Sequence, residues 1–144
     1  MGLLRHGLSP SKLALSVALG VWIAVFPALG VTTALCALVA LALRLNMVAI
    51  QTVNYAAYPL QFLLLFPFFR AGEWLFKRAP LDLSPAEFAA LVMHHPRQAV
   101  VDFWGVTWAA AAVWALLGLV LVPLAWALLT PVFTRIARRQ GAAA

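Results

Sequence analysis

Residues 13–43 read LALSVALGVWIAVFPALGVTTALCALVALAL, and this stretch decides the fold class. It runs for 31 residues without a formal charge between Lys12 and Arg44, and Phe26-Pro27-Ala28-Leu29-Gly30 interrupts it at its centre. A straight transmembrane helix needs about 20 apolar residues to cross about 30 Å of hydrocarbon, so the stretch is too long for one ordinary crossing and too short for two. Its two arms reach only about 20 Å each. We therefore predict a re-entrant helical hairpin that turns at Pro27 and Gly30, with a single kinked crossing as the alternative.

The composition is typical of integral membrane proteins. Of the 144 residues, 65% are hydrophobic and only 10% are charged, and the mean hydropathy is +0.98. In soluble domains about a quarter of the residues are charged. A chain of this length supplies one bundle of a few helices. We therefore expect an all-α, polytopic fold in a single membrane domain, residues 1–144, without a separate soluble catalytic domain.

The basic residues indicate a lipid surface, and not a nucleic acid, as the partner. The formal net charge is +6. Most of the bases flank apolar segments, where such residues fix orientation and meet anionic lipid headgroups. These flanking residues are Arg5, Lys12, Arg44, Arg135, Arg138 and Arg139.

A second apolar segment, residues 45–69, is long enough to span a membrane but carries many polar side chains. At 100° per residue, five of them share a stripe about 100° wide. Because a buried amide must find a partner, we expect the stripe to face the hairpin or a cavity, and Pro59 to kink the helix. Packing between helices is the alternative role for the amides, and snorkelling to headgroups is the alternative for the arginine. The stripe consists of Arg44, Gln51, Asn54, Tyr58 and Gln61, with Asn46 in the same segment.

Small and hydroxyl residues mark the two arms of the hairpin. Ser16, Gly20 and Ala24 recur every four positions on the first arm, which is typical of a surface that another helix approaches closely. Thr32 and Thr33 begin the second arm. Their hydroxyls are candidates to cap its exposed amides and to leave the positive end of the helix dipole available to an anionic group.

Residues 70–102 form a polar connector in which four acidic and four basic side chains cancel. Ser84-Pro85-Ala86-Glu87 has the form of a capping box with proline at the first helical position. It predicts a short interfacial helix that runs to about His95 and is ended by Pro96. His94 and His95 diverge by about 100° on a helix, and no third ligand lies at useful spacing, so we predict no metal site.

The third apolar segment, residues 103–130, is expected to cross the membrane as a helix. Trp104 and Trp108 stand near its start and Trp126 near its end. The 22 residues from Trp104 to Trp126 span about 33 Å on a helix, which suits aromatic belts at both interfaces. Pro123 is expected to kink this helix and Pro131 to end it. Residues 131–144 are then expected to form a basic tail.

The distribution of charge also predicts the orientation. If residues 13–43 return to their own side, the six flanking bases lie together and the neutral connector lies opposite. Both termini are then cytoplasmic by the positive-inside rule. If the segment crosses once, the bases divide six to four between the two sides, which is a weaker asymmetry.

Four motifs fall within about residues 8–78: Leu8-Ser-Pro10, the Pro27-x-x-Gly30 turn followed by two threonines, Leu43-Arg44-Leu-Asn46, and Asn54 with Pro59. Together they resemble the bacterial membrane family known as domain of unknown function 2062. The chain departs from the commoner family pattern, in which the asparagine and the proline are adjacent. The resemblance implies a multi-pass location in the bacterial inner membrane but no established activity. The family's domain also occurs attached to glycosyltransferase-like enzymes, which implies work on envelope glycolipids or lipid carriers.

The sequence carries no recognisable catalytic constellation. It has no G-x-S-x-G elbow and no D-x-D pair, and six residues separate His95 from Asp102 where a glycerolipid acyltransferase motif has four. We therefore expect a non-enzymatic protein without a cofactor.

The leading hypothesis for function is a module that handles or transports a lipid or lipid carrier in the cell envelope. In it, the broken hairpin and the polar stripe form a cleft, and Arg44 meets an anionic headgroup. The alternative is a membrane scaffold or partner subunit that docks an envelope glycan or lipid enzyme, with the same polar residues serving as packing contacts. A homo-oligomer that encloses a pathway is compatible with the first hypothesis.

Overall fold

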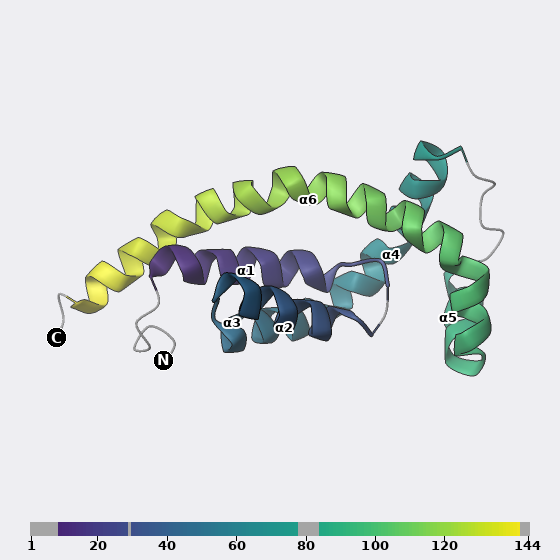
Figure 1. The fold of residues 1–144 in the computed structure, drawn as a ribbon, viewed down its shortest axis with the longest axis horizontal. Coiled ribbons are helices and arrows are strands. Elements are labelled where there is room, and N and C mark those ends of the chain that lie inside the picture. The colour runs from purple at the N-terminus through teal and green to yellow at the C-terminus, as the bar shows by residue number, and fades with distance from the viewer. Residues whose placement is uncertain (1–8, 29, 78–83, 142–144) are drawn as a thin grey trace.

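The computed structural model describes residues 9–28, 30–77 and 84–141, and within them every regular element is a helix, as predicted. Arg5, Leu29 and parts of the expected connector and tail lie outside the described residues. The helices are α1 (Pro10–Ala24), α2 (Thr32–Leu43), α3 (Met47–Ala56), α4 (Tyr58–Leu75), α5 (Pro85–His94) and α6 (Pro96–Gly141) (Figure 1).

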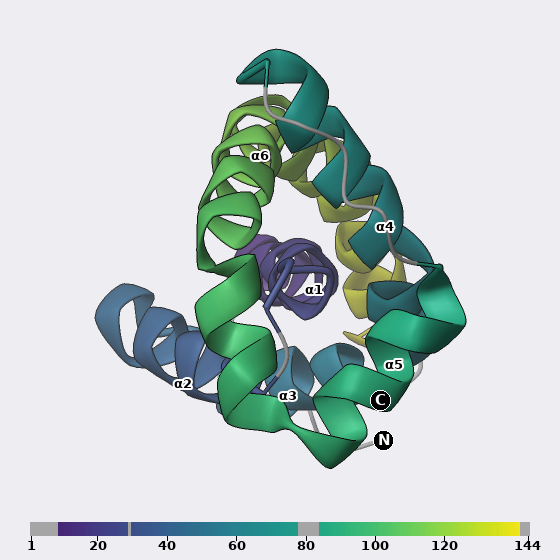
Figure 2. The ribbon, with the colours of Figure 1, turned by 90° about the vertical axis from the view of Figure 1, so that its right-hand side faces the viewer.

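Helix α1 is the central helix of the bundle. It contacts α6, α3, α2 and, over a shorter stretch, α4, and Figure 2 shows these helices around it. It begins at Pro10 because the Ser9 hydroxyl accepts the backbone N–H of Lys12 (3.3 Å), and because proline in a first turn needs no N–H partner. This central helix is the first arm of the predicted hairpin.

The chain reverses direction between α1 and α2. Residues 25–31 make the connection, and α2 runs back beside α1 (Figure 1). Gly30 has a φ of 83°, a left-handed conformation that costs residues with a Cβ about 1–2 kcal/mol. At 15 and 12 residues, α1 and α2 are about 22 and 18 Å long, so each is shorter than a hydrocarbon core is thick.

Small residues on α1 let α3 approach closely, as the spacing of Ser16, Gly20 and Ala24 predicts. A Cβ on Gly20 would lie 2.9 Å from the carbonyl oxygen of Ile50. The Ser16 hydroxyl accepts the backbone N–H of Asn46 (3.2 Å), and all three small residues are buried. Larger side chains at these positions would push the two helices apart.

Residues 45–69 do not form the single helix that we expected. Helix α3 ends at Ala56 and α4 begins at Tyr58, so the kink predicted at Pro59 is a complete break. Proline has no N–H to donate to the carbonyl of Tyr55, and its fixed φ suits the first turn of a new helix. Helix α4 then runs on into the segment that we predicted as connector.

The capping box of α5 is confirmed. The Ser84 hydroxyl accepts the backbone N–H of Glu87 (3.3 Å), and the Glu87 carboxylate accepts the backbone N–H of Ser84 (2.7 Å). Both bonds satisfy amides that the first turn of a helix leaves without a partner. The helix ends at His94, one residue from the predicted boundary.

Helix α6 is much longer than the predicted segment 103–130. It begins at Pro96, directly after α5, and continues to Gly141, so it takes in the end of the connector and most of the basic tail. Pro131 does not end it as expected; both Pro123 and Pro131 lie inside the helix. A proline removes one backbone hydrogen bond, which a long helix can absorb by bending, and Figure 1 shows α6 as an arch along the whole molecule.

Aromatic side chains join α6 to the other helices. Trp114 stacks on Trp22 of α1 (ring centroids 5.7 Å apart), and its Nε1–H donates to the Trp22 carbonyl (3.0 Å). Phe26 meets Trp114 edge-on, with ring centroids 4.9 Å apart. Farther along, Phe88 of α5 packs edge-on against Phe103 (5.0 Å). These contacts extend the core along the length of α6.

One helical stretch in the described part of the chain is long and apolar enough to cross a membrane. It is Phe103–Arg139 within α6, with a hydropathy of 2.4 over its most apolar window, and α1 and α2 are apolar but shorter. Large apolar side chains are exposed on several helices, among them Leu41, Leu63 and Leu119 at 69%, 71% and 74%. Such extensive apolar surface marks an interaction with lipid or with other apolar surfaces.

Candidate functional site

Gln61 holds the turn of the hairpin. Its side chain is fully buried, and its Nε2 group donates to the carbonyls of Phe26 (2.9 Å) and Ala28 (3.1 Å). These carbonyls lie beyond the end of α1, where no helical N–H is available to them. The first turn of α4 is therefore fastened to the connection between α1 and α2.

Gln51 makes a similar link from α3. Its Nε2 group donates to the carbonyl of Thr33, in the first turn of α2 (3.0 Å). Both glutamines donate to backbone carbonyls through Nε2, so the Oε1 atom of each side chain points away from those carbonyls. Both Oε1 atoms are buried and have no hydrogen-bond partner among the described residues.

Asn54 is the most unusual polar residue in this region. Its side chain is fully buried, and neither Oδ1 nor Nδ2 has a hydrogen-bond partner within the described residues. Thr32 Oγ1 is likewise buried and unpartnered there. Leaving a buried polar group unsatisfied costs about 1–3 kcal/mol, so such groups require an explanation.

These four residues of α2, α3 and α4 carry buried polar atoms without a partner among the described residues, and we call them the hairpin cluster: Thr32, Gln51, Asn54 and Gln61. The unpartnered atoms are three amide oxygens, one hydroxyl and one amide nitrogen. Acceptors therefore predominate, and the cluster suits a group that donates hydrogen bonds. It contains no carboxylate or imidazole, and no group of three or more His, Cys, Asp or Glu side chains within the described residues could hold a metal ion.

An apolar cavity of about 330 Å³ adjoins the hairpin cluster, and we call it the turn cavity. Ala28 links the two, since its carbonyl accepts from Gln61 and the same residue lines the cavity. Helices α4, α5 and α6 supply the other walls, including Leu65, Phe88 and Phe103. Gln61 of the hairpin cluster thus bonds to a residue that lines the apolar cavity.

The structure separates Arg44 from the other members of the predicted stripe. Arg44 is exposed in the left-handed C-cap position of α2, at the opposite end of that helix from Thr32. Its carbonyl accepts from Lys12 Nζ (3.3 Å). Arg44 ends α2, Asn54 lies in α3 and Gln61 lies in α4, so the predicted stripe is divided among three helices.

Two other candidates, Asn46 and Tyr58, have local structural roles. Asn46 caps α3 by accepting the backbone N–H of Ala49 (2.9 Å), and Tyr58 packs edge-on against Phe62. The expected capping of α2 by threonine hydroxyls is wrong, because Val31 occupies the N-cap and makes no side-chain bond. Thr32 and Thr33 lie inside the helix, where the hydroxyl is not in the capping position.

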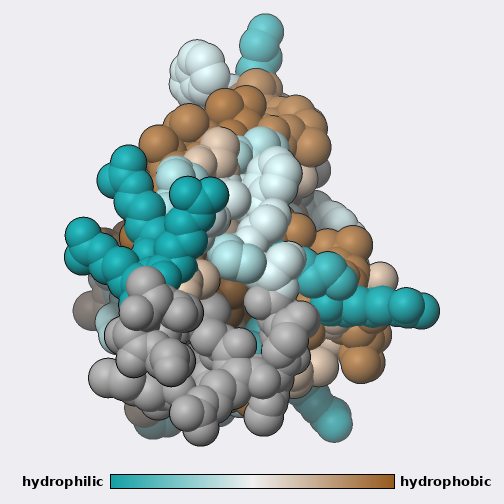
Figure 3. Space-filling model, turned by 90° about the vertical axis from the view of Figure 1, so that its left-hand side faces the viewer, coloured by the Kyte–Doolittle hydropathy of each residue, from teal (hydrophilic) through white to brown (hydrophobic). Residues whose placement is uncertain are grey.

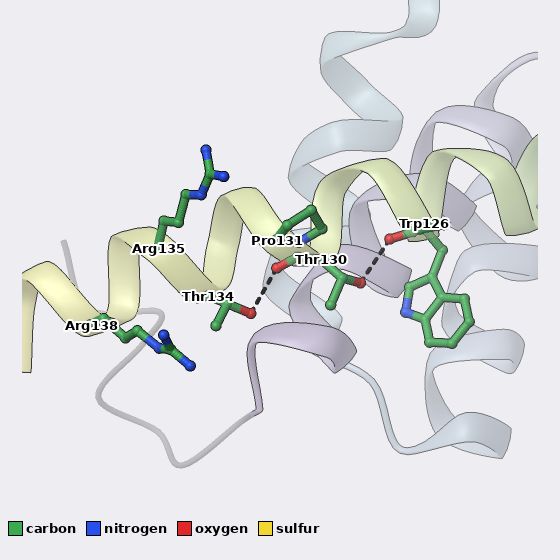
Figure 4. Close-up of a pocket in the computed structure, with 7 residues that line it drawn as sticks. Trp126, Thr130, Pro131, Thr134, Arg135 and Arg138 are labelled. Carbon is green, nitrogen blue, oxygen red and sulfur yellow. Dashed lines mark hydrogen bonds between the residues drawn. The ribbon is translucent and has the colours of Figure 1, made fainter.

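The sequence analysis missed a basic pocket at the C-terminal end of α6. This basic pocket has a volume of about 500 Å³ and is lined by Trp126, Ala127, Thr130, Pro131, Thr134, Arg135 and Arg138. Figure 4 shows the tryptophan, both threonines and Arg138 on one side of the helix and Arg135 on the other. Trp126, Thr130, Thr134 and Arg138 recur at every fourth position, a spacing that places them along one side of a helix. We did not recognise this pattern because we expected the helix to end at Pro131.

Comparison with known proteins identifies one family. Residues 2–142 match the family described as an uncharacterized protein conserved in bacteria (DUF2062). No curated protein and no solved structure matches the chain. The match extends beyond the resemblance of residues 8–78, so α5 and α6 belong to the family's domain as well. The chain is therefore a member of the bacterial family DUF2062.

Proposed function

We propose that this chain is a multi-pass protein of the bacterial inner membrane that handles a lipid or a lipid-linked carrier at the hairpin cluster and the turn cavity. The observation that carries the proposal is Asn54, a fully buried amide without a partner among the described residues. A polar group at that cost is explained if a ligand supplies its partners. The adjoining apolar cavity suits the hydrocarbon part of the same ligand.

The lengths and surfaces of the helices support a membrane location. Helix α6 contains a stretch long and apolar enough for one crossing, while α1 and α2 are shorter and run back beside each other, which is compatible with a re-entrant hairpin. Irregular backbone at membrane depth is tolerated only where protein or a polar cavity covers it. The hydrogen bonds from Gln61 to Phe26 and Ala28 meet that requirement.

The distribution of bases supports the predicted orientation. Lys12 bonds to Arg44, and Trp126 bonds to Ser11, so the start of α1 lies beside the α2–α3 connection and the C-terminal part of α6. Hydrophilic side chains gather at this end (Figure 3). The positive-inside rule then places this end in the cytoplasm.

The chemistry of the cluster narrows the ligand class. Its acceptor oxygens match the hydroxyl groups of a glycerol or sugar headgroup better than a bare phosphate, which requires donors. In the hypothesis from the sequence, the hairpin and the polar stripe form the cleft and Arg44 meets an anionic headgroup. In the proposed site, Arg44 instead meets lipid at the cytoplasmic surface.

Aqueous labelling of a cysteine at position 54 tests the proposal. Cys36, the chain's single cysteine, is buried and is replaced by alanine before Asn54→Cys is introduced. We expect a membrane-impermeant maleimide to label Asn54→Cys in intact membranes and an added glycolipid to slow that labelling. Leu119→Cys serves as the unlabelled control and Arg139→Cys as the labelled one.

The same experiment addresses the scaffold hypothesis. Complete protection of position 54, with the two controls behaving as expected, would mean that the amides only pack between helices. A membrane scaffold for an envelope enzyme would then replace lipid handling as the better function. Native mass spectrometry adds a second readout: a co-purified glycolipid should be lost in Asn54→Leu and kept in Arg44→Gln.

A further inference from the structure

We propose that α5 is a lid on the turn cavity, which swings about His95 to admit the hydrocarbon chain of a ligand and which Phe88 holds closed. The inference rests on the proposed function, because the turn cavity is the chamber assigned to that chain. It adds the way in which the chamber opens and closes.

Helix α5 forms one wall of the turn cavity with a single side. Phe88 and Val92 are four residues apart, so they lie on the same side of the helix, and both line the cavity. Phe88 is the buried residue of α5, and Leu91 and Val92 are partly buried against the same core. The other residues of α5 are exposed. Displacement of this one helix would therefore open the cavity.

Apolar contacts alone hold α5 against the rest of the molecule. The Phe88 ring meets Phe66 and Phe69 of α4 edge-on (ring centroids 5.5 and 5.7 Å apart), in addition to Phe103 of α6. Among the described residues, the side-chain hydrogen bonds of α5 are those of its own capping box. A hydrocarbon chain that enters the cavity offers apolar contacts of the same kind, so it can replace those that Phe88 loses.

The connection between α5 and α6 allows the helix to turn. His95 is the single non-helical residue between them, with φ −136° and ψ 62°, because Pro96 disfavours helical backbone in the residue before it. Its N–H donates to the carbonyl of Leu91 (2.8 Å), and its own carbonyl accepts the N–H of Ala99 (3.0 Å). Within the described part of the chain, no hydrogen bond joins α5 to α6 directly. A rotation about His95 therefore breaks no backbone hydrogen bond, and Figure 1 shows the chain turning sharply between these two helices.

Double electron–electron resonance in nanodiscs of dioleoylphosphatidylcholine tests the motion. Spin labels at Met93→Cys of α5 and Leu119→Cys of α6, two exposed positions, report the lid in a Cys36→Ala background. We expect Phe88→Ala to raise about tenfold the population at a second distance, because three ring contacts are lost. Labels at Val101→Cys and Leu119→Cys, both in α6, should keep one distance in every variant.

Two further variants make the result specific. Val92→Ala trims a second cavity contact, so it should shift the Met93–Leu119 distribution in the same direction by less, and it remains a test if Phe88→Ala fails to fold. Ala90→Ser changes an exposed residue of α5 and should leave the distribution unchanged. A distribution that neither Phe88→Ala nor Val92→Ala alters would overturn the proposal, because α5 would then be a fixed wall. Equal shifts in Val92→Ala and Ala90→Ser would also overturn it, since they would mean general loosening of α5.

The outcome for the lid is separable from that for the proposed function. Monoglucosyldioleoylglycerol, added to the wild-type protein in the same nanodiscs, should raise the population at the second distance. Asn54→Leu should remove this response and leave the effect of Phe88→Ala in place, because Asn54 does not line the cavity. A lid that opens in Phe88→Ala but never responds to the glycolipid would support the lid and count against the proposed ligand. A glycolipid that binds in native mass spectrometry while α5 stays fixed would retain the proposed function and reject the lid.

Discussion

Gln61 joins parts of the chain that are 33 and 35 residues apart, because its single amide nitrogen donates to both carbonyls of the hairpin turn. Such bonds are worth most where water does not compete, and Gln61 is fully buried. Its oxygen and the Asn54 amide remain without partners among the described residues. At the residue scale, the amide nitrogen of Gln61 therefore holds the turn, while its oxygen is left for the ligand that we propose.

Replacement of Gln61 by leucine should destabilise the protein by about 1–3 kcal/mol, since two partly buried carbonyls lose their donor. Gln51→Leu is the matched control, because it removes one exposed bond to Thr33 and should cost less. Thermal unfolding in detergent measures both. An equal loss in the two variants would show that Gln61 has no special role in the turn.

Replacement of Gly20 by leucine should separate α1 from α3. A Cβ there already meets the Ile50 carbonyl oxygen at 2.9 Å and Val53 Cβ at 3.2 Å, so the larger side chain has no space. Overpacking of this kind costs about 1–3 kcal/mol. Ala42→Leu, at an exposed position of α2, adds bulk without a buried contact and should leave the unfolding midpoint unchanged. Unchanged stability in both variants would contradict the close packing.

At the scale of elements, prolines have different effects in different helices. Pro59 separates α3 from α4, whereas Pro123 and Pro131 remain inside α6. Helices α3 and α4 pack on different partners, α3 on α1 and α2, and α4 mainly on α6. A break between α3 and α4 lets each of these helices bury a different face against its own partners. Helix α6 follows a continuous surface, so bending is sufficient.

The capping box gives α5 a dependence on pH. The backbone N–H of Ser84, and then its hydroxyl, lower the pKa of Glu87 below its usual value. A lowered pKa means that the stabilising contribution is present above the unfolded value of about 4.3 and is lost as pH falls through the folded value. The amide shift of Ser84, followed by NMR during an acid titration, should show a midpoint below that of an ordinary glutamate.

Two variants make that titration specific. Glu87→Gln should abolish the transition of the Ser84 amide, and Ser84→Ala should raise the midpoint by removing the hydroxyl bond. A wild-type midpoint at or above the ordinary glutamate value would contradict the capping geometry.

At the scale of the whole molecule, the reversal at residues 25–31 and the single long helix bring Lys12, Arg44 and the end of α6 together. Reporter proteins fused before Ser9 and after Gly141 should both be active in the cytoplasm, because the positive-inside rule acts on these bases. A reporter inserted between α4 and α5 should lie on the opposite side. Termini on opposite sides would contradict the hairpin and favour a single crossing.

The sequence determined the helical class, the turn at Pro27 and Gly30, the small-residue face of α1 and the capping box of α5. Each depends on properties local to a few residues: apolar composition, the backbone freedom of glycine, side-chain size, or hydrogen bonds within one helical turn. The bonds from Gln51 and Gln61 to the hairpin also follow the prediction that their stripe faces it.

Only the tertiary structure decided how these elements divide and which side chains meet. The break near Pro59 and the continuity of α6 through Pro131 depend on which surfaces each helix packs against. A helical wheel assumes one straight axis, so it grouped Arg44 with Asn54, although Arg44 ends α2 and Asn54 lies in α3. The contact of α6 with α1 joins residues far apart in the chain, as in the bond from Trp126 to Ser11 (115 residues). Periodicity within one segment carries no information about a contact of that range.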